Sequence, residues 1–251
     1  MSFADVGDLE AVNVRFGERG RIRLQGRIDR IDTAETEATV YVKIIDYKTG
    51  MAQFDPVSLY YGLQLQLVVY LNAALEMERK LHKDKKVVPA GIFYYRMQDP
   101  VLEKETGDGD EKTREKLLKK LRPDGVLNSD QEVLHLLDLY MNGDSLVIPA
   151  GLKKNGELKA ASSVATPEQF EKLSGFVSGK LAQMGEEILR GDIAVKPFAD
   201  KNGSACDFCE YQDVCGFDRK IPGMCEKRTG DLSKNEAWER IVAEADENEE
   251  V

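Results

Sequence analysis

The chain has 251 residues, 42% of them hydrophobic, which is enough for one large domain with a sizeable core. Its 35 basic and 45 acidic residues give a formal net charge of −10, which excludes nucleic-acid binding through bulk positive charge. Segment 231–251 holds −6 of that charge, so the rest is nearly balanced and leaves room for a local basic groove.

The first third of the chain has the patterns of β-strands. The stretch RIRLQGRIDRID, residues 21–32, alternates apolar with polar side chains, and ATVYVKIIDYK, residues 38–48, is rich in apolar and β-branched types. The acidic stretch TAETEA between them predicts a loop. We therefore expect a β-hairpin here.

Residues 56–81 predict a single buried helix that follows this hairpin. Apolar side chains recur at helical spacing and also occupy the other faces of the helix, and Ser58 is available as a cap near its start. The sequence VVPAGIFYYRM, residues 87–97, then predicts a buried strand.

The middle of the chain is polar and rich in turn residues. We expect residues 99–145 to form a polar and helical insertion, with helical spacing in REKLLKKL and in QEVLHLLDLYM. Asn155-Gly156 predicts a hairpin turn with a strand pair around it.

Two further helices are predicted towards the C-terminus. Thr166-Pro167-Glu168-Gln169 combines an N-cap, a first-turn proline and a capping amide, and opens a helix that runs to about Arg190. Residues 218–251 are predicted to form an acidic C-terminal tail with one charged helix from Ser233.

Asp46 and Lys48 end the second predicted strand. Side chains two residues apart in a strand point to the same side, about 6.5–7 Å apart, so this pair shares a face opposite Ile45 and Tyr47. The hairpin would bring Asp29 beside Asp46, and two carboxylates at one place favour a cation between them. Mg²⁺ takes such oxygen ligands together with water and phosphate, and a nearby lysine suits phosphodiester hydrolysis. A surface ion pair is the simpler alternative.

Four ordered motifs carry a family resemblance. The series Gly26-Arg27-Ile28-Asp29, Asp46-Tyr47-Lys48 and Gln66-x3-Tyr70, with PAGIFYYR at 89–96, resembles the RecB-like branch of the PD-(D/E)xK nuclease superfamily. Within that branch it is similar to the C-terminal nuclease domain of AddB-type ATP-dependent helicase/deoxyribonuclease subunits. The resemblance spans about residues 16 to 217.

The resemblance implies an α/β fold of the restriction-endonuclease type, with a mixed β-sheet flanked by helices. It implies Asp29 and Asp46 as Mg²⁺ or Mn²⁺ ligands, Lys48 as the catalytic lysine, and Gln66 and Tyr70 as the helix motif. Helical geometry independently favours Gln66 over Gln64, because residues 66 and 70 share one face whereas 64 and 66 lie about 200° apart. A core amide bonded to backbone is the alternative for either glutamine.

Neighbouring residues are candidates for DNA contact and for metal binding. Arg27 and Arg30 flank Asp29 and are candidates for DNA phosphate contacts, although Arg30 could equally pair with Asp32. The resemblance implies an upstream histidine or glutamate as a further metal ligand. Glu10 and Glu18 have the surroundings of ordinary loop residues, so we expect this ligand to lie outside the chain.

All four cysteines lie in one short segment. Cys206, Cys209 and Cys215 form a Cys-x2-Cys-x5-Cys run, followed by Cys225. Spacing alone favours metal or iron-sulfur ligation over disulfides and leaves zinc and an iron-sulfur cluster equally open. The resemblance implies a structural [4Fe-4S] cluster held by the first three, with the fourth ligand outside this chain or at Cys225.

These observations predict an Mg²⁺-dependent exonuclease domain at residues 1–217, including the cysteine segment 203–217. The resemblance implies action on unwound single-stranded DNA in double-strand break repair and recombination, with an AddA-like partner subunit. No Walker motif occurs, so any motor belongs to the partner. The alternatives are a stand-alone RecB-like iron-sulfur exonuclease and a non-catalytic DNA-binding scaffold. No apolar run or leader pattern is present, so we expect a cytoplasmic protein without a membrane partner.

Overall fold

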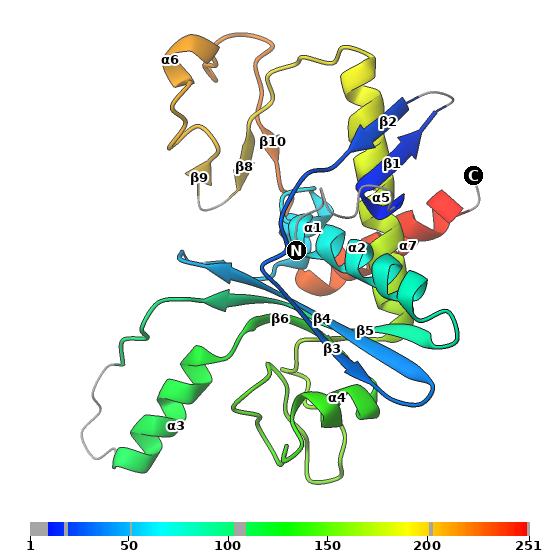
Figure 1. Cartoon of the computed structure of the whole chain (residues 1–251). Coiled ribbons are helices and arrows are strands. Elements are labelled where there is room, and N and C mark those ends of the chain that lie inside the picture. Colours follow the sequence, from blue (N-terminus) through cyan, green and yellow to red (C-terminus); the bar gives the residue numbers. More distant parts are fainter. Residues whose placement is uncertain (1–9, 18–19, 51, 103–108, 201–202, 250–251) are drawn as a thin grey trace.

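The structure, a computed structural model, describes residues 10–17, 20–50, 52–102, 109–200 and 203–249. A five-stranded mixed sheet with helices on both faces lies at its centre (Figure 1). The neighbours β3–β4 and β5–β6 are antiparallel, and β4–β5 and β6–β7 are parallel. This is the mixed α/β architecture predicted from the sequence. In sheet order the strands are β3 (Arg30–Glu35), β4 (Thr39–Lys48), β5 (Lys86–Arg96), β6 (Asp124–Asn128) and β7 (Val164–Ala165).

The predicted hairpin is formed by β3 and β4, but the first predicted strand is split. Its upstream part is β2 (Gly20–Arg23), which pairs with β1 (Asn13–Phe16) in a separate two-stranded sheet after the 3-10 turn η2 (Glu10–Val12). The Leu24 N–H donates to the Val12 carbonyl at 2.7 Å, which continues that pairing beyond β2. The two parts of the alternating stretch 21–32 therefore belong to two different sheets.

The predicted helix over 56–81 is wrong in its middle, because two helices occupy this stretch. They are α1 (Pro56–Tyr60) and α2 (Gln66–Leu81). Gly62 between them has a φ of +84°, a value that side chains strongly disfavour, so the helix is interrupted there. Asp55 caps α1, and the hydroxyl of Ser58 donates to Asp55 instead of providing the cap.

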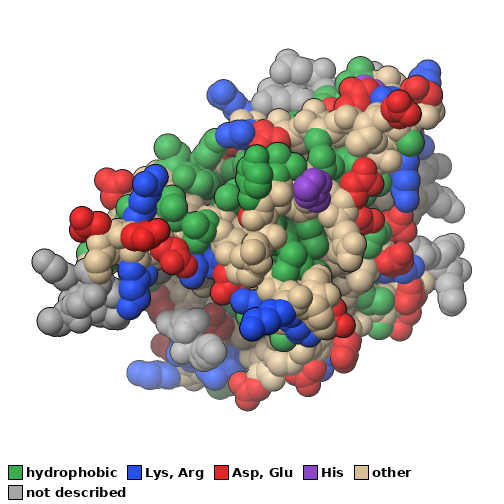
Figure 2. All heavy atoms as spheres, turned by 90° about the horizontal axis from the view of Figure 1, so that it is seen from below, with side chains coloured by type: hydrophobic (Ala, Val, Ile, Leu, Met, Phe, Trp, Pro, Cys, Tyr) green, Lys and Arg blue, Asp and Glu red, His purple; other side chains and the backbone are tan. Residues whose placement is uncertain are grey.

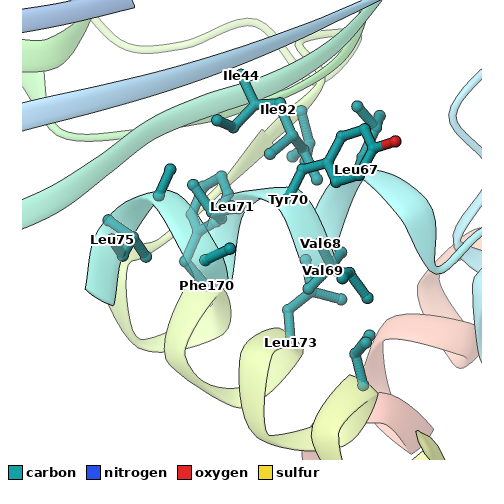
Figure 3. Packing of buried hydrophobic residues seen from close by; sticks show 14 of the residues in the cluster. Ile44, Leu67, Val68, Val69, Tyr70, Leu71, Leu75, Ile92, Phe170 and Leu173 are labelled. Atoms are coloured by element: carbon teal, nitrogen blue, oxygen red, sulfur yellow. The ribbon is translucent and has the colours of Figure 1, made fainter. Parts of the chain in front are cut away.

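The main core lies between the sheet and two layers of helix. The long helix α5 (Pro167–Leu189) starts at the predicted capping box of Thr166 and Gln169 and packs behind α2. Figure 3 shows the side chains that meet in this core, from the sheet, from α2 and from α5. Those from the sheet are Ile44 and Ile92, those from α2 include Leu67, Tyr70 and Leu71, and those from α5 are Phe170 and Leu173.

The opposite face of the sheet carries α3 (Asp110–Leu121) and α4 (Gln131–Leu137), in the two places where helices were predicted. Strand β6 lies between them in sequence and belongs to the central sheet, so residues 99–145 are not wholly peripheral. Residues 103–108 of this stretch lie outside the described residues. Gly156 has a φ of +84° and forms the predicted turn, flanked by an isolated antiparallel bridge between Leu152 and Leu158.

The C-terminal part folds back onto the molecule. A three-stranded sheet holds β8 (Phe198–Asp200), β9 (Gly203–Ser204) and β10 (Lys227–Arg228), with α6 (Gln212–Cys215) between β9 and β10 in sequence. The predicted last helix is α7 (Lys234–Glu249), which packs against α5 and α1. Its Ala237, Ile241 and Ala245 are fully buried, so this acidic segment is not a free tail. The domain boundary at residue 217 stays a prediction.

None of the helices in the described ranges combines the length and the apolar character needed to cross a membrane.

Candidate active site

Asp46 and Lys48 lie near the end of β4, on the face that α2 covers. Asp46 is 3% exposed, and the Lys48 Nζ is 2.6 Å from its Oδ2. Ile44, two residues earlier on the same face, belongs to the core beneath α2. Because side chains two residues apart in a strand share a face, Ile44, Asp46 and Lys48 follow one another along this face, from the apolar core to the end of β4.

Asp29 precedes β3 and lies one register step beyond the pair Arg30 and Ile45, which places it opposite Asp46. Its Oδ2 accepts a hydrogen bond from the Tyr47 backbone N–H at 3.0 Å. The Asp29 carboxylate is thus fixed to the residue that follows Asp46, at an exposed bend of the chain. The hairpin brings the two acids to the same end of the sheet.

Gln66 connects the strand pair to the helix above it. The Lys48 Nζ donates to the Gln66 Oε1 at 3.0 Å, and the Gln66 Nε2 donates to the Tyr70 hydroxyl at 2.8 Å. Gln64 instead accepts from the Asp55 backbone N–H at 3.0 Å, so it stabilises the start of α1. The two glutamines have separate contacts, as expected, but the reason is that Gln64 lies before α2 whereas Gln66 belongs to that helix.

The buried carboxylate of Asp46 tests whether a metal ion fits this place. Its Oδ2 forms an ion pair with the Lys48 ammonium at 2.6 Å. An ionised carboxylate has about four lone-pair sites, so one ammonium leaves acceptor capacity that a metal ion can use. Asp29 and Asp46 offer the hard oxygen donors that Mg²⁺ and Mn²⁺ prefer, so the donor set fits such an ion.

The described residues contain no group of three or more His, Cys, Asp or Glu side chains arranged around one point. The register of β3 and β4 places Asp29 opposite Asp46, so these two carboxylates are the candidate ligands. Mg²⁺ sites commonly use one or two carboxylates and complete their octahedron with water and substrate phosphate. The arrangement matches that pattern.

Tyr94 and Asp124 extend the site across the sheet, and no pattern in the sequence indicates this role for either. Tyr94 on β5 is paired with Asp46 and with Asp124 on β6, so the three side chains form one row on the α2 face. The Lys48 Nζ lies 5.5 Å from the centroid of the Tyr94 ring. Asp124 accepts from the Phe54 backbone N–H at 2.6 Å and so ties the segment before α1 to the sheet. Only the strand register reveals this row.

Burial, followed by the negative charge of Asp46, raises the pKa of Tyr94 to about 12. The phenol is therefore neutral throughout the physiological pH range. A neutral phenol next to Asp46 keeps its proton and adds no negative charge to a place that already holds a buried carboxylate.

Arg30 does not join this cluster. Its side chain lies on the other face, where it donates to Asp32 at 2.6 Å and to the Tyr47 hydroxyl at 3.4 Å. The hydrogen bonds to Asp32 and then to Tyr47 raise the pKa of Arg30 above its ordinary value. Arg27 is exposed beside Asp29, and its contact with DNA phosphate stays a prediction.

The four cysteines are all free, and the structure does not bring them together. Cys206 and Cys209 are partly exposed and Cys215 and Cys225 are exposed, on the short segment that holds β9 and α6. No described group of potential ligands includes them. The predicted ligand set therefore stays a prediction.

Comparison with known proteins places this geometry in a family. The model of the PD-(D/E)XK nuclease superfamily matches residues 4–216, which include Asp29, Asp46 and Lys48. The chain belongs to the PD-(D/E)XK nuclease superfamily. The strand pair that carries the acids and the lysine lies within the matched region, as does the helix that carries Gln66.

Curated relatives of this PD-(D/E)XK nuclease chain are each named as one subunit of an ATP-dependent helicase/deoxyribonuclease. The protein from Clostridium acetobutylicum is 38% identical over 98% of this chain and 21% of its own length. Those from Clostridium kluyveri and Lachnoclostridium phytofermentans are 35% and 38% identical, over 95% and 89% of this chain and 21% and 20% of their own lengths. The chain thus spans about a fifth of the length of these relatives.

Proposed function

We propose that this chain is a metal-dependent DNA exonuclease domain that hydrolyses phosphodiester bonds of unwound single strands during double-strand break repair. Its relatives are named as subunits of a helicase and deoxyribonuclease, which supports work beside an AddA-like partner subunit. The observation that carries the proposal is the buried carboxylate of Asp46 paired with Lys48, at the end of the sheet where Asp29 also lies.

In the proposed mechanism the carboxylates of Asp29 and Asp46 hold a divalent metal ion. When bound, that ion supplies Lewis-acid polarisation of the scissile phosphate. The Lys48 ammonium lies where it can orient a water molecule or stabilise negative charge that grows on the phosphate. Gln66 holds Lys48 through its Oε1, and Tyr70 in turn holds the Gln66 amide, so the ammonium is oriented before substrate arrives.

The test is digestion of labelled single-stranded DNA by the purified chain, with Mg²⁺ or Mn²⁺ and with EDTA. We expect cleavage with metal, none with EDTA, and a loss of about 100-fold or more in Asp46→Asn, which removes a charged ligand and keeps the shape. Glu157→Gln is the control, because it also turns a carboxylate into an amide, and Glu157 is exposed and pairs with Lys153 at the turn around Gly156.

Two other results would contradict the proposal. Cleavage that survives both EDTA and Asp46→Asn would assign the reaction to another site or to a contaminant. DNA binding without cleavage under any metal would support the non-catalytic scaffold instead. Cleavage by this chain alone, without a partner subunit, would agree equally with the stand-alone exonuclease.

We also propose that Cys206, Cys209 and Cys215 hold a [4Fe-4S] cluster in the longer protein. Three thiols within ten residues on one short segment support this proposal. With its fourth ligand elsewhere in the protein, the cluster would attach the small sheet of β8, β9 and β10 to the rest of the molecule. Metal analysis after anaerobic purification of the full-length protein should give iron, with absorbance near 400 nm, and Cys209→Ser should remove both. One equivalent of zinc without iron would contradict the cluster.

A further inference from the structure

The face of the sheet opposite Asp46 contains a groove of about 530 Å³ between β4, β5 and α3. Its lining includes the aromatic side chains of Tyr47 and Tyr95 and the cationic side chains of Arg30, Lys43 and Arg122. Figure 2 views the molecule from this side and shows hydrophobic side chains lying next to Lys and Arg. Neither the proposed cleavage nor the cysteine segment uses this groove.

We propose that this groove binds bases of the single-stranded DNA, which stack on Tyr47 and Tyr95 while Arg30, Lys43 and Arg122 face the sugar-phosphate chain. The inference rests on the proposed function in taking DNA as the substrate. It adds a second DNA-contact region on the other face of the sheet, which would hold the single-stranded DNA near Asp29 and Asp46.

The two tyrosines form a stacking platform. Tyr47 is 36% exposed, and its ring meets Tyr95 edge to face, with centroids 5.9 Å apart and planes at 83°. An edge-to-face pair leaves a ring face that the other ring does not cover. Bases stack on such faces without sequence preference, because every base has a π-face. The Arg30 contact with the Tyr47 hydroxyl fixes the ring in place.

The charge of the groove favours a polyanion. Arg30 and Lys43 bond to the same carboxylate, that of Asp32, at 2.6 Å and 2.8 Å, so two positive charges share one negative charge. Burial by itself would raise the pKa of Asp32, but the hydrogen bonds from Arg30 and Lys43 together hold that pKa below its ordinary value. Arg122 donates to the neutral Ser145 carbonyl at 2.9 Å. No Asp or Glu is among the described residues that line the groove.

The groove and the candidate active site lie on opposite faces of β4, at neighbouring residues. Tyr47 lies between Asp46 and Lys48 in sequence and points to the opposite face. β4 and β5 run parallel and end side by side at one edge of the sheet (Figure 1). A single strand that crosses this edge can place a phosphate at Asp46 and Lys48 and a neighbouring base against Tyr47.

The experiment measures binding of fluorescent oligo-dT to the 251-residue chain by anisotropy in EDTA, where no cleavage occurs. We expect the double variant Tyr47→Leu with Tyr95→Leu to bind about five-fold or more weakly, because leucine keeps apolar volume but cannot stack. Tyr140→Leu is the matched control, since Tyr140 is 91% exposed and lies outside the groove. Circular dichroism confirms that each variant folds.

A second arm separates stacking from charge by comparing oligo-dT with an abasic strand of equal length. The unaltered chain should prefer the strand with bases, and the double leucine variant should lose this preference. The double variant Lys43→Gln with Arg122→Gln should weaken the binding of oligo-dT and of the abasic DNA to the same extent, and should lower the salt dependence of binding.

The outcomes distinguish this inference from the proposed nuclease function. Stacking-dependent binding without any cleavage would support the groove and contradict the exonuclease. Normal cleavage with unchanged binding in the double leucine variant would overturn the groove alone. Unchanged DNA binding together with weaker binding of a purified helicase partner would make the groove a protein interface and also overturn the inference.

Discussion

At the scale of single residues, two glutamines two positions apart have different tasks. Gln66 contacts Lys48 and Tyr70, whereas Gln64 accepts from the Asp55 backbone N–H at the start of α1. Their difference follows from the short break before α2, since Gln66 is the first residue of that helix and Gln64 precedes it. One amide orients an ammonium and the other completes a helix start.

This contrast gives a matched pair of variants. Gln66→Leu should slow DNA cleavage by about 10- to 100-fold, because Lys48 loses the acceptor that orients it, and should leave the free energy of unfolding nearly unchanged, because Gln66 is exposed. Gln64→Leu should lower the free energy of unfolding by about 1 kcal/mol and leave kcat nearly unchanged.

Single-turnover cleavage and urea unfolding of both variants make the measurement. Equal effects of the two substitutions on cleavage would show that Gln66 acts through the fold and not through Lys48.

At the scale of elements, the helices show which local signals are reliable. The capping box at Thr166 and the proline after it predict the start of α5 correctly, because both act within a single turn. The apolar spacing over residues 56–81 predicts helix correctly at both ends but misses the break at Gly62. An isolated glycine is compatible with a continuous helix, so the local pattern does not decide between the two.

The sequence of helix α7 gives little indication that the helix is packed, because its composition is acidic and its buried residues form a narrow stripe. Ile241→Ala should lower the free energy of unfolding by about 2–5 kcal/mol, because Ile241 is fully buried in the core beside α5. Leu189→Ala on α5 is the control. Leu189 is 70% exposed, so its loss should change stability by less than about 0.5 kcal/mol.

Urea unfolding followed by circular dichroism measures both variants. An Ile241→Ala variant as stable as the unaltered chain would mean that α7 is a dispensable tail after all.

At the scale of the whole molecule, the two faces of the sheet carry different kinds of side chain, which come close to each other at the ends of β4 and β5. The α2 face carries the buried acid Asp46 with Lys48, and the opposite face carries the aromatic and cationic groove at Tyr47. The net charge of −10 does not prevent this, because acidic residues gather in segment 231–251 while cations line the groove. Local charge, and not the total, decides where a polyanion can bind.

The sequence by itself determined the strand that ends in Asp46 and Lys48, the cap of α5, and the placement of Gln66 and Tyr70 on one helix face. The strand and the helix face follow from periods of two and of 3.6 residues, and the cap follows from side chains within one turn, so each depends on a short stretch alone. The tertiary structure alone decided that Tyr94 and Asp124 stand in a row with Asp46, and that the acidic C-terminal segment packs against α5 and α1 as α7. These depend on strand register and on the packing of distant segments, and no short stretch of sequence contains either.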